Sequence, residues 1–74
     1  MTGKELTELV CANLKKARKE AGFTLSKAGK KLGVNYQQIY NFERGVTLPR
    51  PQNLCDLSEV YGIDVLDLFR KGEE

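Results

Sequence analysis

Histidine is absent from this sequence and cysteine is rare, so the imidazole is missing as a metal ligand and as a general base, and few thiols remain. The two cysteines, Cys11 and Cys55, lie far apart in the chain, and neither belongs to a Cys-x-x-Cys motif. We interpret both as small, buried or half-buried residues of a reduced cytosolic protein. We therefore expect the chain to hold no metal and no cofactor.

Long apolar segments are also absent, because the runs of apolar residues are only a few residues long. Neither a secretory signal peptide nor a membrane-spanning helix is expected, which places the protein in the cytoplasm. The sequence contains no glycine-rich phosphate loop and no serine with a supporting base motif. Its length predicts one domain, residues 1–74, and a chain of this size buries only about 60% of its unfolded surface. Little room remains for an active-site cavity, so we expect no enzymatic activity.

Charge of the two signs is distributed unevenly along the chain. Residues 1–50 contain ten Lys and Arg against four Asp and Glu, a net charge of +6, whereas residues 51–74 contain two against six, a net charge of −4. A basic first part suits a polyanion, and the acidic last part is left for solvent or for a protein partner. The alternative is that Lys15, Lys16, Lys19 and Lys30 form a solvated surface that keeps the protein soluble.

Apolar periodicity predicts an all-α chain of five helices with no strand. The first helix covers about residues 4–21 and ends at Gly22, and the fourth covers about residues 52–61 and ends at Gly62. A short fifth helix follows Asp64 and ends at Phe69. The buried stripes are expected to be Leu6, Val10, Leu14, Ala17 and Ala21 in the first helix, and Leu54, Leu57 and Tyr61 in the fourth.

Residues 25–44 predict a helix, a three-residue break and a second helix. Thr24 is the expected N-cap of the first of these helices, and Asn35 caps the second, with Gln38 completing a variant capping box. Two helices joined by so short a turn cross steeply, so their closest approach requires a small residue, which Gly29 supplies. Gly33 accepts the positive φ that the turn needs. The residues expected to close the inner side of the pair are Leu32, Val34, Ile39 and Phe42.

The outer face of the second of these helices carries Tyr36, Gln37, Tyr40 and Asn41. Most helical hairpins in small domains bind nothing, so apolar residues at helical spacing are by themselves only evidence of a core. A solvated helix is usually covered by Lys and Glu, however, whereas this face offers amides and phenols. Gln and Asn match the adenine N6/N7 pattern, and Tyr can reach a phosphate or a thymine methyl. We therefore predict a DNA-reading helix.

A set of motifs is spread over roughly residues 6–69, and its members are Leu14 to Thr24, Lys31 to Val34, Ile39, Phe42 to Gly45, Pro49 and Tyr61 to Val65. These motifs resemble the phage repressor and Cro family of helix-turn-helix domains, the Xre-like group. The resemblance implies an all-α, five-helix bundle of the lambda-repressor-like type, whose third helix enters the major groove. It also implies a transcriptional regulator that binds DNA as a dimer.

Carried onto this sequence, the resemblance implies a role for three groups of residues. A buried ion pair between Arg18 and Glu43 ties the first helix to the end of the third. Bases are contacted by Tyr36, Gln37, Tyr40 and Asn41. Phosphates are contacted by Arg44, Thr47 and Arg50 from the loop after the third helix. Apart from the resemblance, we also expect phosphate contacts from Thr24, Lys27 and Gln38, and from backbone N–H groups at the start of the second helix.

Two departures from the family pattern affect the second helix. The family usually begins this helix with Gln, which grips a phosphate or a base edge, and this chain has Leu25. The family also prefers Leu followed by Ala where this chain has Ala28 and Gly29. Glycine inside a helix costs about 0.5–1 kcal/mol relative to alanine. We therefore expect a less stable second helix with an unusually close crossing.

The last predicted helix is apolar on more sides than one small core can cover, which predicts a homodimer interface at Val65, Leu66 and Phe69. The alternative is a monomer with an apolar end.

We expect the protein to bind double-stranded DNA sequence-specifically and to repress transcription at a palindromic operator. It is expected to be bacterial or phage-encoded and associated with the nucleoid. The other function left open is an antitoxin or coactivator-like interaction module, with a protein partner bound by the acidic C-terminal part.

Overall fold

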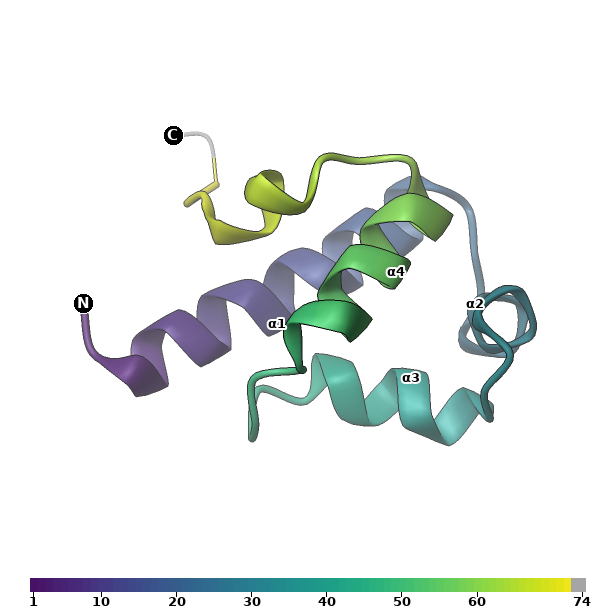
Figure 1. Ribbon diagram of the computed structural model, residues 1–74, viewed down its shortest axis with the longest axis horizontal. Coiled ribbons are helices and arrows are strands. Elements are labelled where there is room, and N and C mark those ends of the chain that lie inside the picture. The colour runs from purple at the N-terminus through teal and green to yellow at the C-terminus, as the bar shows by residue number, and fades with distance from the viewer. Residues whose placement is uncertain (73–74) are drawn as a thin grey trace.

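The computed structural model describes residues 1–72 and confirms an all-α chain over that range (Figure 1). Four α-helices are followed by a single short 3-10 helix, which we label η1. Their bounds are α1 Gly3–Glu20, α2 Leu25–Leu32, α3 Tyr36–Glu43, α4 Pro51–Tyr61 and η1 Val65–Phe69. None of the helices within residues 1–72 is long and apolar enough to cross a membrane.

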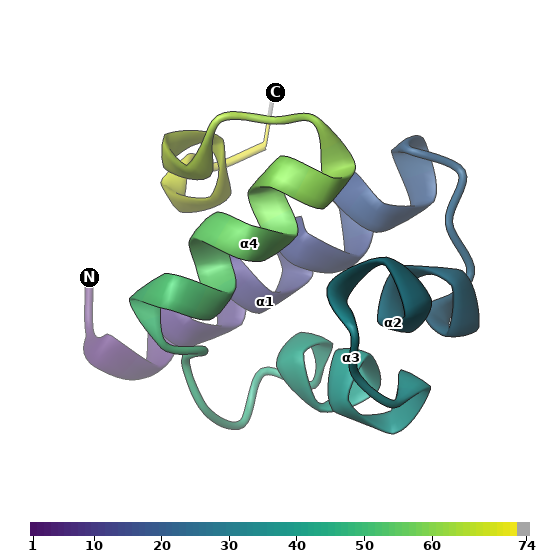
Figure 2. The same ribbon diagram turned by 45° about the vertical axis from the view of Figure 1, so that its right-hand side comes forward.

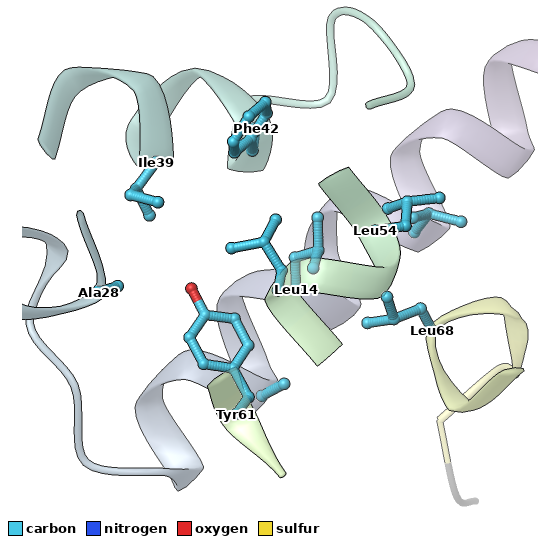
Figure 3. Close-up of a cluster of buried hydrophobic side chains, with 10 residues drawn as sticks. Leu14, Ala28, Ile39, Phe42, Leu54, Tyr61 and Leu68 are labelled. Atoms are coloured by element: carbon cyan, nitrogen blue, oxygen red, sulfur yellow. The ribbon is translucent and has the colours of Figure 1, made fainter. Parts of the chain in front are cut away.

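The long helix α1 and the shorter α4 form the centre of the structure (Figure 2). The pair α2 and α3 lies on one side of them and η1 on the other, so every element contributes side chains to one core. Figure 3 shows these side chains converging from different helices. The core cluster consists of Val10, Leu14, Ala17, Ala28, Ile39, Phe42, Leu54, Leu57, Tyr61 and Leu68.

The expected fifth helix is a 3-10 helix, which corrects the prediction of five α-helices. The Asp64 carboxylate accepts the backbone N–H of Leu66 at 2.9 Å, so the segment is capped as expected. It is only five residues long, and its N–H groups bond three residues back, as from Asp67 to the Asp64 carbonyl at 2.9 Å. One buried residue, Leu68, is enough to attach so short a helix to the core.

Asn13 of α1 fixes the segment that ends η1. Its amide group donates to the carbonyl oxygens of Leu68 and Arg70, at 2.8 Å in each case. These bonds satisfy backbone groups that a 3-10 helix leaves unpaired at its end. This role could not be predicted from local sequence, because Asn13 lies more than 50 residues from its partners along the chain.

The capping box predicted for α3 is not formed. The Asn35 carboxamide oxygen accepts the N–H of Gln37 at 2.7 Å, so the cap bonds to the second residue of the helix and Gln38 takes no part as a box partner. A capping box does occur at the start of α1. There the Thr2 hydroxyl accepts from the Glu5 N–H at 3.1 Å and the Glu5 carboxylate accepts from the Thr2 N–H at 2.8 Å.

Three residues expected to be buried are exposed. Val34 follows Gly33, and its N–H bonds back to the Gly29 carbonyl at 2.8 Å, which turns its side chain away from the core. Ala21 is the C-cap residue of α1 and lies past the end of its buried stripe. Cys55 is exposed because it is adjacent to the α4 stripe, whose buried members are Leu54, Leu57, Ser58 and Tyr61. The expected burial of Cys11 is confirmed, whereas Leu32 is only half-buried.

Candidate nucleic-acid interface

The crossing of α2 and α3 depends on the absence of a side chain at Gly29. A Cβ atom at this position would lie 2.7 Å from the Val34 carbonyl oxygen and 3.2 Å from the Tyr36 backbone nitrogen. Both atoms belong to the backbone and have little freedom to retreat. Gly33, at φ +81°, then turns the chain from α2 into α3. The close crossing expected from the sequence is therefore present, with the start of α3 resting on the backbone of α2.

Helix α3 is anchored by two buried side chains and exposes the rest of its surface. Ile39 is fully buried and Phe42 nearly so. Successive residues of an α-helix are rotated by about 100°. Gln37 and Asn41 therefore lie on the side opposite to Ile39, and both are exposed. Tyr36 and Tyr40, 54% and 52% exposed, lie along one edge of this outer face.

The end of α3 is fixed by an ion pair with α1. The Arg18 guanidinium donates through Nε to Glu43 Oε2 at 2.7 Å and through Nη2 to Glu43 Oε1 at 3.1 Å. Its third nitrogen, Nη1, donates to the Phe23 carbonyl at 2.9 Å, so one side chain links α1, the loop before α2 and α3. Both charged groups are buried, and the hydrogen bonds to Glu43 raise the pKa of Arg18. The orientation of α3 is thereby set from its buried side.

The loop between α3 and α4 is held against α1. The thiol of Cys11 donates to the Thr47 carbonyl at 3.7 Å, a weak bond, and burial raises the pKa of this thiol. Pro49 in the same loop is buried. Thr47 and Arg50, both exposed, are thus presented from a loop that is attached to the core on its inner side.

A cleft of about 260 Å³ lies between α3, this loop and the first turn of α4. Both apolar and polar side chains line it, and Phe42, Leu48 and Pro49 are its apolar residues. Three of the expected phosphate ligands meet here, and so does Asn41, which was predicted to contact bases. The polar lining residues are Gln38, Asn41, Thr47, Arg50 and Asn53.

Asn53 was not among the residues predicted from the sequence. It lies in the first turn of α4, where it resembles an ordinary polar residue of a helix surface. Arg50 is the N-cap of α4 and makes no side-chain capping bond, so the first N–H groups of this helix have no such partner. Only the fold brings this helix end beside the face of α3.

Thr24 and Lys27 lie elsewhere, at the start of α2. The Thr24 hydroxyl accepts the N–H of Lys27 at 3.1 Å and so caps α2, as expected. In Figure 1, α2 lies at one end of α3 and the loop towards α4 lies at the other. The expected phosphate ligands therefore form two groups that flank α3 rather than one patch.

Arg44 and Tyr40 contact each other at the end of α3. The Arg44 guanidinium carbon lies 5.9 Å from the centroid of the Tyr40 ring, within range of a cation–π interaction. These residues were assigned separately from the sequence, Tyr40 to bases and Arg44 to phosphate. The structure brings them together as one unit on the exposed side of α3.

The residues expected at a dimer interface differ in their exposure. Leu66 and Phe69, three residues apart in η1, are 62% and 39% exposed and project from the same side of a helix with three residues per turn. Val65 is half-buried and packs against the core cluster. The apolar surface left on η1 is thus formed mainly by Leu66 and Phe69.

Comparison with known proteins gives matches that cover most of this structure. A family model described as helix-turn-helix matches residues 14–68, from the middle of α1 to η1. The chain is also 35% identical over 60 residues to the HTH-type transcriptional regulator ImmR of Bacillus subtilis (strain 168). That alignment covers 81% of this chain and 47% of the relative, so the chain spans about half the length of the curated protein that it matches.

Proposed function

Because this chain belongs to the Xre/Cro-like helix-turn-helix family, we propose that it binds double-stranded DNA sequence-specifically and regulates transcription in the cytoplasm. The observation that carries this proposal is the exposed face of α3. Its two amides and two phenols stand on a helix whose opposite side is fixed by Ile39, Phe42 and the Glu43 ion pair. A rigid helix with hydrogen-bonding side chains is what direct readout in the major groove requires.

In the proposed complex α3 lies in the major groove. Gln37 and Asn41 are one helical turn apart on the outer face, so they address neighbouring base pairs, and their amides match the N6/N7 pattern of adenine. Gln37 belongs to the first turn of α3, and the N-terminal part of a recognition helix enters the groove most deeply. Tyr36 and Tyr40 flank the amides and contact thymine methyl groups or the backbone.

The two polar groups beside α3 are proposed to hold the phosphate backbone. Thr24 and Lys27, with the free N–H groups of the first turn of α2, contact one phosphate. The cleft formed by Gln38, Thr47 and Arg50, to which we add Asn53, contacts another. These contacts fix the register of α3 without reading sequence.

We propose that two copies associate through Leu66 and Phe69 when bound to DNA. A two-fold contact between these residues buries apolar surface that a monomer leaves in water. Two recognition helices would then lie about 34 Å apart and match half-sites separated by one turn of DNA. The expected operator is accordingly a palindrome, and repression follows if this operator overlaps a promoter.

Selection of bound sequences from a random pool of duplexes tests the proposal. The proposed function predicts enrichment of a palindromic motif, and affinity for that motif that falls steeply between about 50 and 200 mM salt. Failure to enrich any motif at 50 mM salt would contradict it.

A second candidate function, a protein-interaction module, is favoured by the acidic surface of α4. A groove of about 390 Å³ is lined by Cys55, Asp56, Ser58, Glu59, Ile63 and Val65. Its two half-buried apolar side chains and two carboxylates suit a basic amphipathic segment of another protein. A synthetic amphipathic helix of Leu and Lys, titrated into the nitrogen-15-labelled protein, should shift the backbone amide NMR signals of residues 55–65. A helix of Leu and Glu should not shift them. Equal shifts from both peptides would argue against a specific site.

A further inference from the structure

We propose that Arg44 reads a guanine base in the major groove and is held over the outer face of α3 by the ring of Tyr40. The proposal rests on the DNA-binding function proposed above and deepens it by naming a base. It also changes the role that family resemblance gives Arg44, which is a contact to phosphate from the loop after α3.

The backbone places Arg44 on the reading face and not beside it. Arg44 is the C-cap of α3, and its φ of −70° and ψ of −22° continue the right-handed helical conformation. It follows Gln37 by seven residues, which is nearly two full turns, so the two side chains differ by only about 20° around the helix. Arg44 therefore extends the outer face formed by Gln37 and Asn41 by one more turn.

The contact with Tyr40 directs the side chain along that face. Long side chains of a helix lean toward its N-terminus, over the preceding turn, and the residue one turn before Arg44 is Tyr40. The guanidinium carbon lies 5.9 Å from the ring centroid, and Arg44 forms no ion pair with any residue of the described range 1–72. The ring thus holds the guanidinium near the outer face, with no carboxylate to neutralise it.

The chemistry of a stacked guanidinium suits a guanine. Stacking uses the flat face of the group and leaves its N–H donors, which lie in the plane, free to bond outward. Two of these donors match the O6 and N7 acceptors that guanine presents in the major groove. Because Gln37 and Asn41 match adenine, the expected half-site contains adenines toward the N-terminal end of α3 and a G·C pair at the end reached by Arg44.

Binding of Arg44 variants to duplexes of defined sequence tests the assignment. The probes are four duplexes: the one enriched by selection, and three versions of it that carry the other base pairs at the position nearest the C-terminal end of α3. The native protein should prefer guanine there by roughly 5- to 150-fold. Arg44→Ala should lose that preference, and Arg44→Lys should keep only a small part of it although it keeps the charge, because a Lys ammonium lacks the two donors that Arg holds in one plane.

A phosphate contact would behave differently. Arg44→Ala would then weaken binding to all four duplexes alike and lower the salt slope by about one per protomer, while Arg44→Lys would change little. That result would overturn the proposal. Absence of any sequence preference in the native protein would instead overturn the proposed function, so the two failures are distinguishable.

The role of Tyr40 is tested in the free protein and then on DNA. Proton NMR of the Arg44 side chain should show ring-current shifts in the native protein and in Tyr40→Phe, and these shifts should be lost in Tyr40→Leu. The preference for guanine should likewise be retained in Tyr40→Phe and reduced in Tyr40→Leu. The control is Tyr36→Leu, which removes a similarly exposed ring on α3 and should leave the Arg44 signals unchanged. Unchanged Arg44 signals in Tyr40→Leu would exclude the stacked arrangement.

Discussion

Arg18 and Glu43, 25 residues apart in the sequence, are joined by two parallel hydrogen bonds that fasten the end of α3 to α1. A bidentate pair fixes orientation as well as distance. With the third bond from Arg18 to the Phe23 carbonyl, it joins α3, α1 and the entry to α2. The geometry of the exposed face of α3 therefore depends on a contact that does not itself reach the surface.

Removal of Arg18 should destabilise the protein severely. Arg18→Ala leaves the Glu43 carboxylate buried without a partner, which lowers the free energy of unfolding by about 3–5 kcal/mol. In a domain this small, such a loss is enough to leave most of the molecules unfolded. Lys19→Ala, at the neighbouring exposed position, should change the free energy of unfolding by less than about 0.5 kcal/mol. Urea unfolding followed by circular dichroism measures both. Similar small effects would show that the pair contributes little.

Tyr61 should make stability depend on pH in the alkaline range. Burial, reinforced by the charge of Glu43, raises the pKa of its phenol from 10.0 to about 12. The folded protein therefore keeps a proton that the unfolded chain releases. The contribution of the Tyr61 phenol to the free energy of unfolding is complete below pH 10 and is lost as pH rises toward 12. The full loss is about 3 kcal/mol, since the shift is about two pKa units and one unit corresponds to roughly 1.4 kcal/mol.

Tyr61→Phe isolates this effect from the titration of lysines. The Tyr61 hydroxyl has no hydrogen-bond partner within residues 1–72, and Figure 3 shows it directed into the core on the side of Ala28 and Ile39. The variant should thus be as stable as the native protein at pH 7, or more stable by about 1 kcal/mol. Its advantage over the native protein should widen as the pH rises from about 10 toward 12. A constant difference over that range would contradict the buried, protonated phenol.

Gly29→Ala should destabilise the protein although alanine is the better helix former. The added methyl group would meet the Val34 carbonyl oxygen at 2.7 Å, and such overpacking typically costs about 1–3 kcal/mol, more than the gain in helix propensity. The matched control is Gly3→Ala in the first turn of α1, where a Cβ meets nothing within 4 Å. That change should be neutral or mildly stabilising. Thermal melts that show both variants to be stabilised would exclude the close crossing.

Leu66→Ser should weaken assembly on DNA without unfolding the protein, because Leu66 is 62% exposed. Sedimentation with a palindromic duplex should give two native protomers per duplex at saturation and mostly one for the variant. Val46→Ser, at another exposed apolar position, serves as the control and should keep the native stoichiometry. One native protomer per duplex would contradict the proposed dimer.

Local signals made most of the helices predictable. Thr24 caps α2, Gly33 and Gly62 adopt the positive φ that ends a helix, and the apolar stripe of α4 is buried as expected. Each of these features depends on residues within one or two turns of one another. The same holds for the exposed face of α3, because a helix anchored by Ile39 and Phe42 must turn Gln37 and Asn41 outward.

Features that depend on distant contacts were not predictable. The contact of Asn13 with the end of η1, and the position of Asn53 beside α3, depend on how whole helices pack. Asn35 caps α3 as predicted, but the capping box with Gln38 is not formed, because the Asn35 side chain accepts the N–H of Gln37 instead of that of Gln38. Val34 was placed in the core by its apolar character, whereas the turn that follows Gly33 decides its direction.

In the proposed complex Gln37 reads DNA sequence from the outer face of α3, while Arg50 only holds the backbone. These two roles are separated by the ratio of affinities for the selected duplex and for a scrambled duplex, measured over a range of salt concentrations for Gln37→Ala and Arg50→Ala. Gln37→Ala should lose about 1–3 kcal/mol of binding free energy on the selected duplex and little on the scrambled one. Arg50→Ala should weaken both alike and reduce the salt slope by about one per protomer. An unchanged affinity ratio in Gln37→Ala would contradict the assignment of this face as the one that reads bases.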